Sequence, residues 1–362
     1  MTTFAKLDWT YRFEKERRVT VRCPAAVGNL VYVVFLYERG RASESKLLAL
    51  NIDSGSSVWE HKIANVGNEA IVDHEGRVYW SSFSGEIYGF LPNGIQFLKN
   101  PCGRSSIGVP CLAESRQLVV GEISGLSKET WCLDRSTGEV LWRFEHGGHS
   151  YAICIWNGHV FHSSVKSNGF DKPARCGLYC LNLLDGTLKW SAIGIEYTFA
   201  PIVIDDKLIV GSSRSLRAFD VASGAVLAEL ALTKVNFTHQ VSPCSIQNSI
   251  IVKRDSHDQG NDTLTALSLN SETQSNGKGM KFLIQWTIEE PRGLCGSPIA
   301  LRAGELSYLT HDGTICILER ASGRLLAETR LKTKMNSFGG GQTVVGSKLM
   351  VTHDRSIFCF SI

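Results

Sequence analysis

FAPIVIDDKLIVGSSRSLRAFDVASGAVLAEL, the stretch from Phe199 to Leu230, contains four short runs rich in β-branched and aliphatic residues. Turn-forming residues separate these runs at positions 205–206, 214–215 and 222–224. Short apolar runs bounded by Gly, Asp and Ser are typical of β-strands joined by tight turns. The stretch therefore predicts a unit of four antiparallel strands.

The third run of this unit recurs eight times along the chain of 362 residues. The copies are LLALNI from Leu47, IYGFLP from Ile87, TWCLDR from Thr130, LYCLNL from Leu178, LRAFDV from Leu216, LTALSL from Leu264, ICILER from Ile315 and IFCFSI from Ile357. Their starts are about 40 to 50 residues apart, and a repeat of that length indicates a solenoid or a propeller. The repeats leave no room for a second domain, so we expect residues 1–362 to form a single domain.

The two ends of the chain carry the two parts of one further unit. IFCFSI at the C-terminus has no outer strand after it, whereas AKLDWTYRF near the N-terminus resembles an outer strand with no unit before it. We therefore expect residues 1–14 to complete the last unit. The prediction is an all-β fold, an eight-bladed β-propeller of four-stranded antiparallel blades closed by pairing of its N- and C-terminal strands. Closing the ring removes the sheet edges that promote aggregation.

A common signature follows the third strand: a small residue, then Asp or Asn, a turn glycine and a tryptophan. Five of the eight tryptophans occupy this outer-strand position: Trp9, Trp59, Trp142, Trp190 and Trp286. We interpret them as wedges that pack one blade on the next, since buried aromatic residues mostly belong to the core. Three repeats depart from the signature, because Leu91 replaces the acidic residue in the second, and Ala228 and Ala327 replace tryptophan in the fifth and seventh. The sixth repeat has an insertion from Asn270 in place of the tight turn.

The pattern A-x-[DN]-x-x-[TS]-G-x-x-x-W resembles the quinoprotein-type repeat, over essentially the whole chain. The resemblance implies the eight-bladed propeller of pyrroloquinoline-quinone (PQQ) dehydrogenases and of the non-enzymatic propellers related to BamB. Those dehydrogenases hold their cofactor over a calcium ion bound by acidic and amide side chains, and many contain a pair of adjacent cysteines. No two cysteines of this chain are adjacent, and its first residues contain no apolar core of signal-peptide length. We therefore expect no cofactor and no bound metal.

The 11 cysteines do not resemble a disulfide framework, because their number is odd and they are spread over a long chain. Cys132, Cys180 and Cys359 occupy the small-residue position that holds alanine in sister repeats. A buried free cysteine behaves as a small apolar residue. Reduced cysteines favour a cytoplasmic location. The alternative is metal binding, but Cys176 and Cys180 have no second pair at zinc-ligand spacing.

Composition excludes several classes of function. The net charge is +3 at pH 7 and the pI about 8.2, so we expect neither a nucleic-acid surface nor a membrane partner. The chain has no phosphate-binding loop, no H-E-x-x-H and no G-x-S-x-G motif.

His311-Asp312 and His353-Asp354 occupy equivalent positions in neighbouring repeats. We interpret them as hairpin turns, the alternative being a metal or acid–base site shared by two blades.

The loops that lead from an outer strand to the next first strand are expected to form the rim of a central channel. The candidate binding residues on this rim are Arg22, Glu69, Arg104, His149, Tyr151, Glu196, Tyr197, His239, Arg292 and Phe338. Aromatic, Arg and His side chains are common in binding hot spots. The alternative is an ordinary polar rim around water. We expect binding on this rim rather than on a second face carrying the long loops that start at Val165 and Arg254.

Two functions remain open, because a propeller fold supports many. The first is a non-catalytic scaffold or adaptor whose partner is another protein. The alternative is a sensor or enzyme that takes a small ligand at the mouth of the channel. A PQQ-dependent dehydrogenase is the least favoured interpretation.

Overall fold

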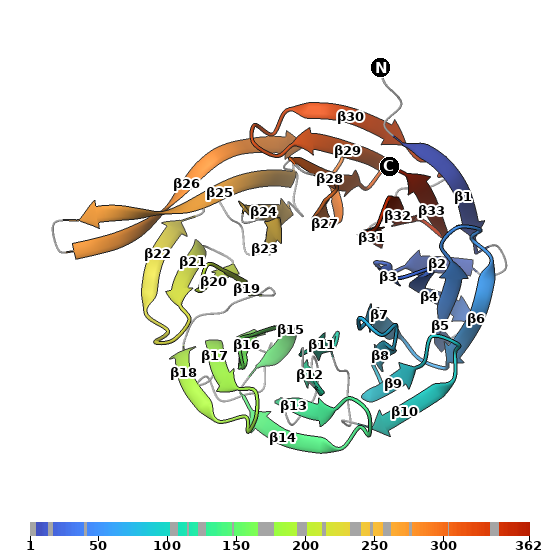
Figure 1. The fold of residues 1–362 in the computed structure, drawn as a ribbon, viewed down its shortest axis with the longest axis horizontal. Coiled ribbons are helices and arrows are strands. Elements are labelled where there is room, and N and C mark those ends of the chain that lie inside the picture. The colour runs from blue at the N-terminus through green and yellow to red at the C-terminus, as the bar shows by residue number, and fades with distance from the viewer. Residues whose placement is uncertain are drawn as a thin grey trace.

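The computed structural model describes most of the chain in sixteen segments. These are residues 5–13, 17–39, 42–101, 108–113, 116–121, 128–146, 148–165, 177–193, 201–211, 215–231, 240–246, 249–255, 262–274, 277–302, 304–333 and 340–362. Eight antiparallel sheets form a ring in which each sheet is one blade (Figure 1). The predicted eight-bladed propeller is therefore confirmed. The segments that the structure describes contain no helix that could span a membrane.

The blades follow one another in chain order, and each runs from the ring axis outward. The innermost strands of blades 1 to 8 are β2 (Arg17–Val21) with β3 (Ala25–Val27), β7 (Gly67–Val72), β11 (Cys111–Leu112), β15 (His149–Trp156), β19 (Ile202–Ile204), β23 (Gln240–Ile246), β27 (Leu294–Ala300) and β31 (Gly340–Val345). The second strands are β4 (Leu30–Arg39), β8 (Val78–Ser82), β12 (Gln117–Gly121), β16 (His159–Val165), β20 (Lys207–Gly211), β24 (Ser249–Asp255), β28 (Glu305–Thr310) and β32 (Lys348–His353).

The third and fourth strands form the outer half of each blade. The third strands are β5 (Ala42–Asn51), β9 (Glu86–Phe90), β13 (Glu129–Asp134), β17 (Gly177–Asn182), β21 (Ser215–Asp220), β25 (Asp262–Gln274), β29 (Thr314–Glu319) and β33 (Ser356–Ser361). The outer strands are β6 (Ser57–Ile63), β10 (Gln96–Pro101), β14 (Val140–Glu145), β18 (Leu188–Ile193), β22 (Val226–Ala231), β26 (Gly277–Glu290), β30 (Leu325–Arg330) and, in blade 8, β1 (Lys6–Arg12).

The chain termini close the ring as predicted. Strand β1 pairs with β33, so the outer strand of blade 8 comes from the other end of the chain. Trp9 lies opposite Cys359 in this pair, just as Trp59 lies opposite Ala49 in blade 1. The N-terminal strand therefore occupies the same register as every other outer strand.

Each tryptophan of the outer strands docks on the next blade. The indole N–H of Trp142 donates to the carbonyl oxygen of Leu183 at 2.8 Å, and the ring covers Gly186 in the same turn of blade 4. Gly186 has a φ of +71°, and a Cβ there would lie 2.7 Å from the indole, so only glycine fits. The same contact is made by Trp9 with Ile52, Trp59 with Pro92, Trp190 with Val221 and Trp286 with Arg320. The interpretation of these residues as wedges between blades is confirmed.

Three blades lack the tryptophan, and two of them, blades 2 and 5, show other apolar contacts in its place. In blade 2, Leu98 occupies the position opposite Gly89 and packs on Gly138 of blade 3. In blade 5, the small Ala228 lies in the same apolar cluster as Phe282 of blade 6. Phe282 directly follows the insertion that the sequence places from Asn270, which lengthens β25 and β26 into a hairpin projecting from the ring (Figure 1). A leucine of the same blade thus takes the place of the indole in blade 2, and a phenylalanine of the neighbouring blade packs near the vacant position in blade 5.

The core is divided into packed layers between successive blades. The described second and third strands are buried on both faces, as in β8 and β12, because each blade is covered by a neighbour on either side. Each apolar cluster joins strands of two adjacent blades. A site between two blades is therefore sensitive to how closely those blades pack.

Candidate functional site

The two classes of loop that the sequence analysis separated lie on the same face. Each blade is antiparallel, so the outer-to-inner loops and the turns between second and third strands emerge together. The backbone N–H of Phe83, in a second-to-third turn, donates to the carbonyl of Val66 in an outer-to-inner loop at 2.7 Å. The expectation of two different faces is therefore wrong. We call this face the upper face, and the face formed by the other turns the lower face.

Most of the predicted rim residues cannot be placed. Five lie outside the described residues: Arg104, Glu196, Tyr197, His239 and Phe338. His149 and Tyr151 lie in the innermost strand β15, and the structure describes their backbone only. Glu69 also lies within a strand, β7, rather than in a loop. The binding role of all these residues therefore stays a prediction. The structure describes side-chain positions only for Arg22, Glu69 and Arg292.

Arg22 and Glu69 are brought together on the upper face. Arg22 lies between β2 and β3 of blade 1, and its guanidinium is 3.8 Å from the carboxylate of Glu69 in blade 2. Both side chains are about one-third exposed. The carbonyl of Arg22 accepts a hydrogen bond from the Thr352 hydroxyl of blade 8 at 3.0 Å. Arg22 therefore links three blades at the inner strands and is neutralised by an acidic neighbour.

Arg292 lies between the outer strands of blades 6 and 7, contrary to the expectation that it faces the ring axis. Its guanidinium donates to both carboxylate oxygens of Glu290, at 2.7 and 2.8 Å, and to Glu328 in β30 at 3.3 Å. Glu290 is 3% exposed and also accepts from the Tyr308 hydroxyl. Burial raises the pKa of Glu290, but the bonds from Arg292 and Tyr308 outweigh it and hold this pKa below its usual range.

Substitution of Arg292 should therefore reduce stability rather than binding. Arg292→Ala leaves a buried carboxylate with fewer donors, so we expect the free energy of unfolding to fall by about 1–3 kcal/mol. Arg324→Ala is the matched control, because its pair with Glu319 is exposed. The control should change the free energy by no more than about 0.5 kcal/mol. Urea denaturation measures both, and equal values for the two variants would contradict the structural role.

Of the two histidine–aspartate pairs, His311-Asp312 and Asp354 lie in turns, whereas His353 is the last residue of β32. Asp312 accepts hydrogen bonds from the hydroxyls of Thr310 and Thr314 and from the Thr314 backbone. His353 is fully buried and bonds the carbonyl of His311 at 2.9 Å. Turn contacts thus account for Asp312 as expected, whereas His353 is a buried strand residue. Within the described segments, no group of three or more His, Cys, Asp or Glu side chains is arranged to hold a metal ion.

The described cysteines are free thiols in the core or close to it. They are Cys23, Cys111, Cys132, Cys154, Cys180, Cys295, Cys316 and Cys359. Cys102 and Cys176 lie outside the described residues, and only the backbone of Cys244 in β23 is described. Cys132 and Cys180 face the tryptophans of their own outer strands, as the small-residue position requires. Burial raises the pKa of both thiols to about 12. Thiols so far from ionisation are poor nucleophiles and poor metal ligands.

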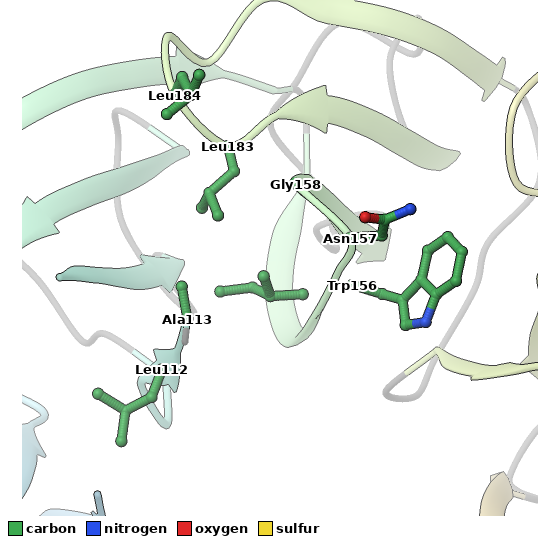
Figure 2. Close-up of a pocket in the computed structure, with 8 residues that line it drawn as sticks. Leu112, Ala113, Trp156, Asn157, Gly158, Leu183 and Leu184 are labelled. Carbon is green, nitrogen blue, oxygen red and sulfur yellow. The ribbon is translucent and has the colours of Figure 1, made fainter. Parts of the chain in front are cut away.

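A recess lined mainly by apolar side chains lies on the lower face between blades 3 and 4 (Figure 2). Its volume is about 660 Å³. Leu112 and Ala113 border it from blade 3, and the turn Trp156–Gly158 and the turn residues Leu183 and Leu184 border it from blade 4. The innermost strand of blade 3, β11, contains two residues, Cys111 and Leu112.

Leu184 is the most exposed large apolar residue described, at 75%. It occupies the turn position that holds Asp53, Ser136 or Ala222 in sister repeats. Trp156 is half-buried, whereas the other tryptophans outside the outer strands, Trp80 and Trp131, are fully buried. The sequence analysis missed both residues. Their signal was a leucine in a polar turn and a tryptophan outside the repeated position.

The comparisons with known proteins agree with this fold. The family described as "Outer membrane protein assembly factor BamB" matches residues 70–324. The chain belongs to this family. Among solved structures, BamB from Moraxella catarrhalis has a TM-score of 0.66 at 16% identity, covering 99% of this chain and 98% of that one. No curated protein sequence matches the chain.

Other propellers are similar to this BamB-like chain in structure alone. A europium-containing methanol dehydrogenase has a TM-score of 0.73 at 11% identity, covering 99% of this chain and 93% of that one. Sqt1 of Saccharomyces cerevisiae has a TM-score of 0.70 at 10% identity, covering 97% and 98%. At such identities the similarity establishes the architecture, and function has to be argued from the site.

Proposed function

We propose that this BamB-like propeller is a non-catalytic scaffold that binds another protein through the recess between blades 3 and 4. The observation that carries the proposal is the exposed Leu184 beside an open apolar recess. Exposed apolar side chains next to a depression are typical of protein-binding surfaces. The ring is closed and its blades are densely packed. Its surface is therefore preformed, and binding costs little conformational entropy on the side of the propeller.

The lining favours an apolar protein segment over a small polar ligand. Among the side chains that line the recess, only the Asn157 amide and the Trp156 indole N–H are polar. Small-molecule sites usually combine an apolar wall with several convergent polar groups that fix the ligand. A leucine- or phenylalanine-bearing segment requires no such groups, because the burial of its side chain supplies the affinity at about 25 cal/mol per Å². The partner is therefore a protein that presents a bulky apolar side chain.

The test compares two charge substitutions of exposed leucines. Leu184→Asp places a carboxylate at the recess, and we expect it to weaken partner binding at least tenfold, as for a hot-spot residue. Leu325→Asp is the matched control, since Leu325 is 50% exposed on the outer strand of blade 7. Affinities are measured by calorimetry with a purified partner, identified by mass spectrometry after capture from the native host. Equal affinity of the two variants would contradict the proposal.

We also propose a cytoplasmic location, supported by the free thiols of the described cysteines. The denatured, unreduced protein should therefore react with a thiol reagent at nearly all of its 11 cysteines. Several unreactive cysteines that become reactive only after reduction would indicate disulfides and an oxidising compartment.

A further inference from the structure

Another cavity, with a volume of about 600 Å³, lies in the outer half of the interface between blades 1 and 2. Blade 1 borders it with the end of β6 and the two residues that follow, and blade 2 borders it with β9, β10 and the turn before β9. Its volume is close to that of the recess between blades 3 and 4, but its walls are polar. The polar side chains of both walls include His61, Asn65, Ser84, Glu86, Gln96 and Lys99.

Glu86 and Lys99 form a pair on the blade 2 wall. The Oε2 atom of Glu86 accepts hydrogen bonds from the hydroxyls of Tyr88 at 2.6 Å and Ser84 at 3.1 Å. Its Oε1 atom lies 3.4 Å from the Nζ atom of Lys99, farther than the roughly 2.7–2.9 Å of a strong charge-assisted hydrogen bond. The bond from Tyr88 is the main cause that holds the pKa of Glu86 below its usual range. The ionised carboxylate and the ammonium group therefore retain capacity to bind a ligand.

His61 contributes a neutral imidazole from the blade 1 wall. Its ring centroid lies 6.0 Å from that of Tyr88. Burial, and then the charge of Lys99, hold the pKa of His61 below its usual range. A neutral imidazole has one donor and one acceptor nitrogen. In blades 3, 5 and 6, the register position of His61 holds an apolar residue: Phe144, Leu230 and Ile288.

The charges of the lining are balanced, which favours a neutral ligand. Glu86 neutralises Lys99, and Lys62, the other charged residue of the lining, lies 3.8 Å from Glu60. An ionic ligand would have to displace one of these partners. A hydroxyl group leaves both pairs intact, because it can donate to Glu86 and accept from Lys99 at the same time. An apolar segment is disfavoured, because it would bury these polar groups without hydrogen bonds.

We propose that the cavity between blades 1 and 2 is a binding site for a sugar, a mono- or disaccharide held through its hydroxyl groups. Glu86 and Lys99 bind neighbouring hydroxyls on one side, and His61, Asn65 and Gln96 supply donors and acceptors around them. The cavity volume lies within the range of about 300–1,000 Å³ that is usual for small-ligand sites. The same chemistry recognises a free sugar and the terminal unit of a glycan. The site shares no residue with the recess of the proposed function.

Saturation-transfer NMR titrations of the whole protein test the site with glucose, galactose, mannose, N-acetylglucosamine, maltose and lactose. We expect at least one of these sugars to bind the wild type. Glu86→Gln and Lys99→Met should each weaken its binding at least about tenfold, the usual effect of losing a hydrogen bond to a charged group. Lys99→Met keeps the proposal testable if Glu86→Gln fails to fold, because the Lys99 side chain is 53% exposed.

Glu319→Gln is the matched control, because the Glu319 carboxylate pairs with Arg324 at 3.2 Å in blade 7. It should bind the sugar as the wild type does. An array of immobilised oligosaccharides distinguishes the two sources, since a glycan ligand binds on the array and a free sugar binds only in solution.

Three results would overturn the sugar site. They are the absence of sugar binding both in solution and on the array, binding of glycine or lysine in place of the sugars, and sugar binding that is unchanged in both site variants. None of them bears on the recess, whose test is Leu184→Asp, so failure of the sugar site and failure of the proposed function are distinguishable.

Discussion

Deletion of residues 1–14 is expected to abolish the stable fold or to cause aggregation. The deletion removes β1, the outer strand of blade 8, and exposes the full edge of β33. It also removes Trp9, whose indole bonds Ile52 at 2.8 Å, and Phe13, which stacks on Phe35 at 5.0 Å. Loss of a buried aromatic side chain costs about 3–5 kcal/mol. The free energy of unfolding should thus fall by at least about 5 kcal/mol, as measured by urea denaturation.

Two point variants in β1 distinguish the loss of the Trp9 contact, which closes the ring, from the mere shortening of the chain. Trp9→Ala removes the docking contact while keeping the strand, and it should account for about 3 kcal/mol or more of the effect. Leu7→Ser is the control, since Leu7 is 48% exposed. It should alter stability by about 0.5 kcal/mol or less. An unchanged melting temperature of the truncated protein would show that the N-terminal strand does not close the ring.

Trp142→Ala is expected to produce a large loss of stability in blade 3. Trp142 is 7% exposed, and its ring fills the space between blade 3 and the turn at Gly186. A cavity of that size costs about 3–5 kcal/mol. Blade 5 tolerates Ala228 because Phe282 packs there, but blade 4 has no lengthened hairpin to supply such a residue. Leu141→Ala, at a 36% exposed neighbour, is the control and should cost less than about 1 kcal/mol.

The sequence contained enough information for the ring and its closure. Each tryptophan of an outer strand docks on a turn of the next repeat. The same kind of contact therefore recurs from blade to blade, and it appears in the sequence as a recurring tryptophan and turn glycine. Trp9 pairs with the small residue Cys359 of the last repeat as Trp59 pairs with Ala49 of the first. The substitution of Leu98 for a tryptophan was harder to predict, because the shortened turn at Gly94 obscures the register of the second repeat.

The candidate site was less predictable, because its residues are distant in the sequence. The recess combines residues 112–113, 155–158 and 183–184, which only the packing of two blades brings together. Arg292 was assigned to the rim from its place in a loop, but its side chain turns toward Glu290 two residues earlier. Residue type and loop class do not determine which way a side chain points. The error over the two faces had a different origin, since the antiparallel order of the strands already placed both loop classes together.

Site-directed photocrosslinking in the native host tests the central claim most directly. A photoreactive amino acid replaces Leu184 at the recess, Leu325 on the outer wall or Glu69 on the upper face. The account predicts one discrete protein adduct from position 184 and none from the other two positions. A discrete adduct from position 69 alone, or equal adducts from all three positions, would contradict the claim that this propeller binds its partner through the recess.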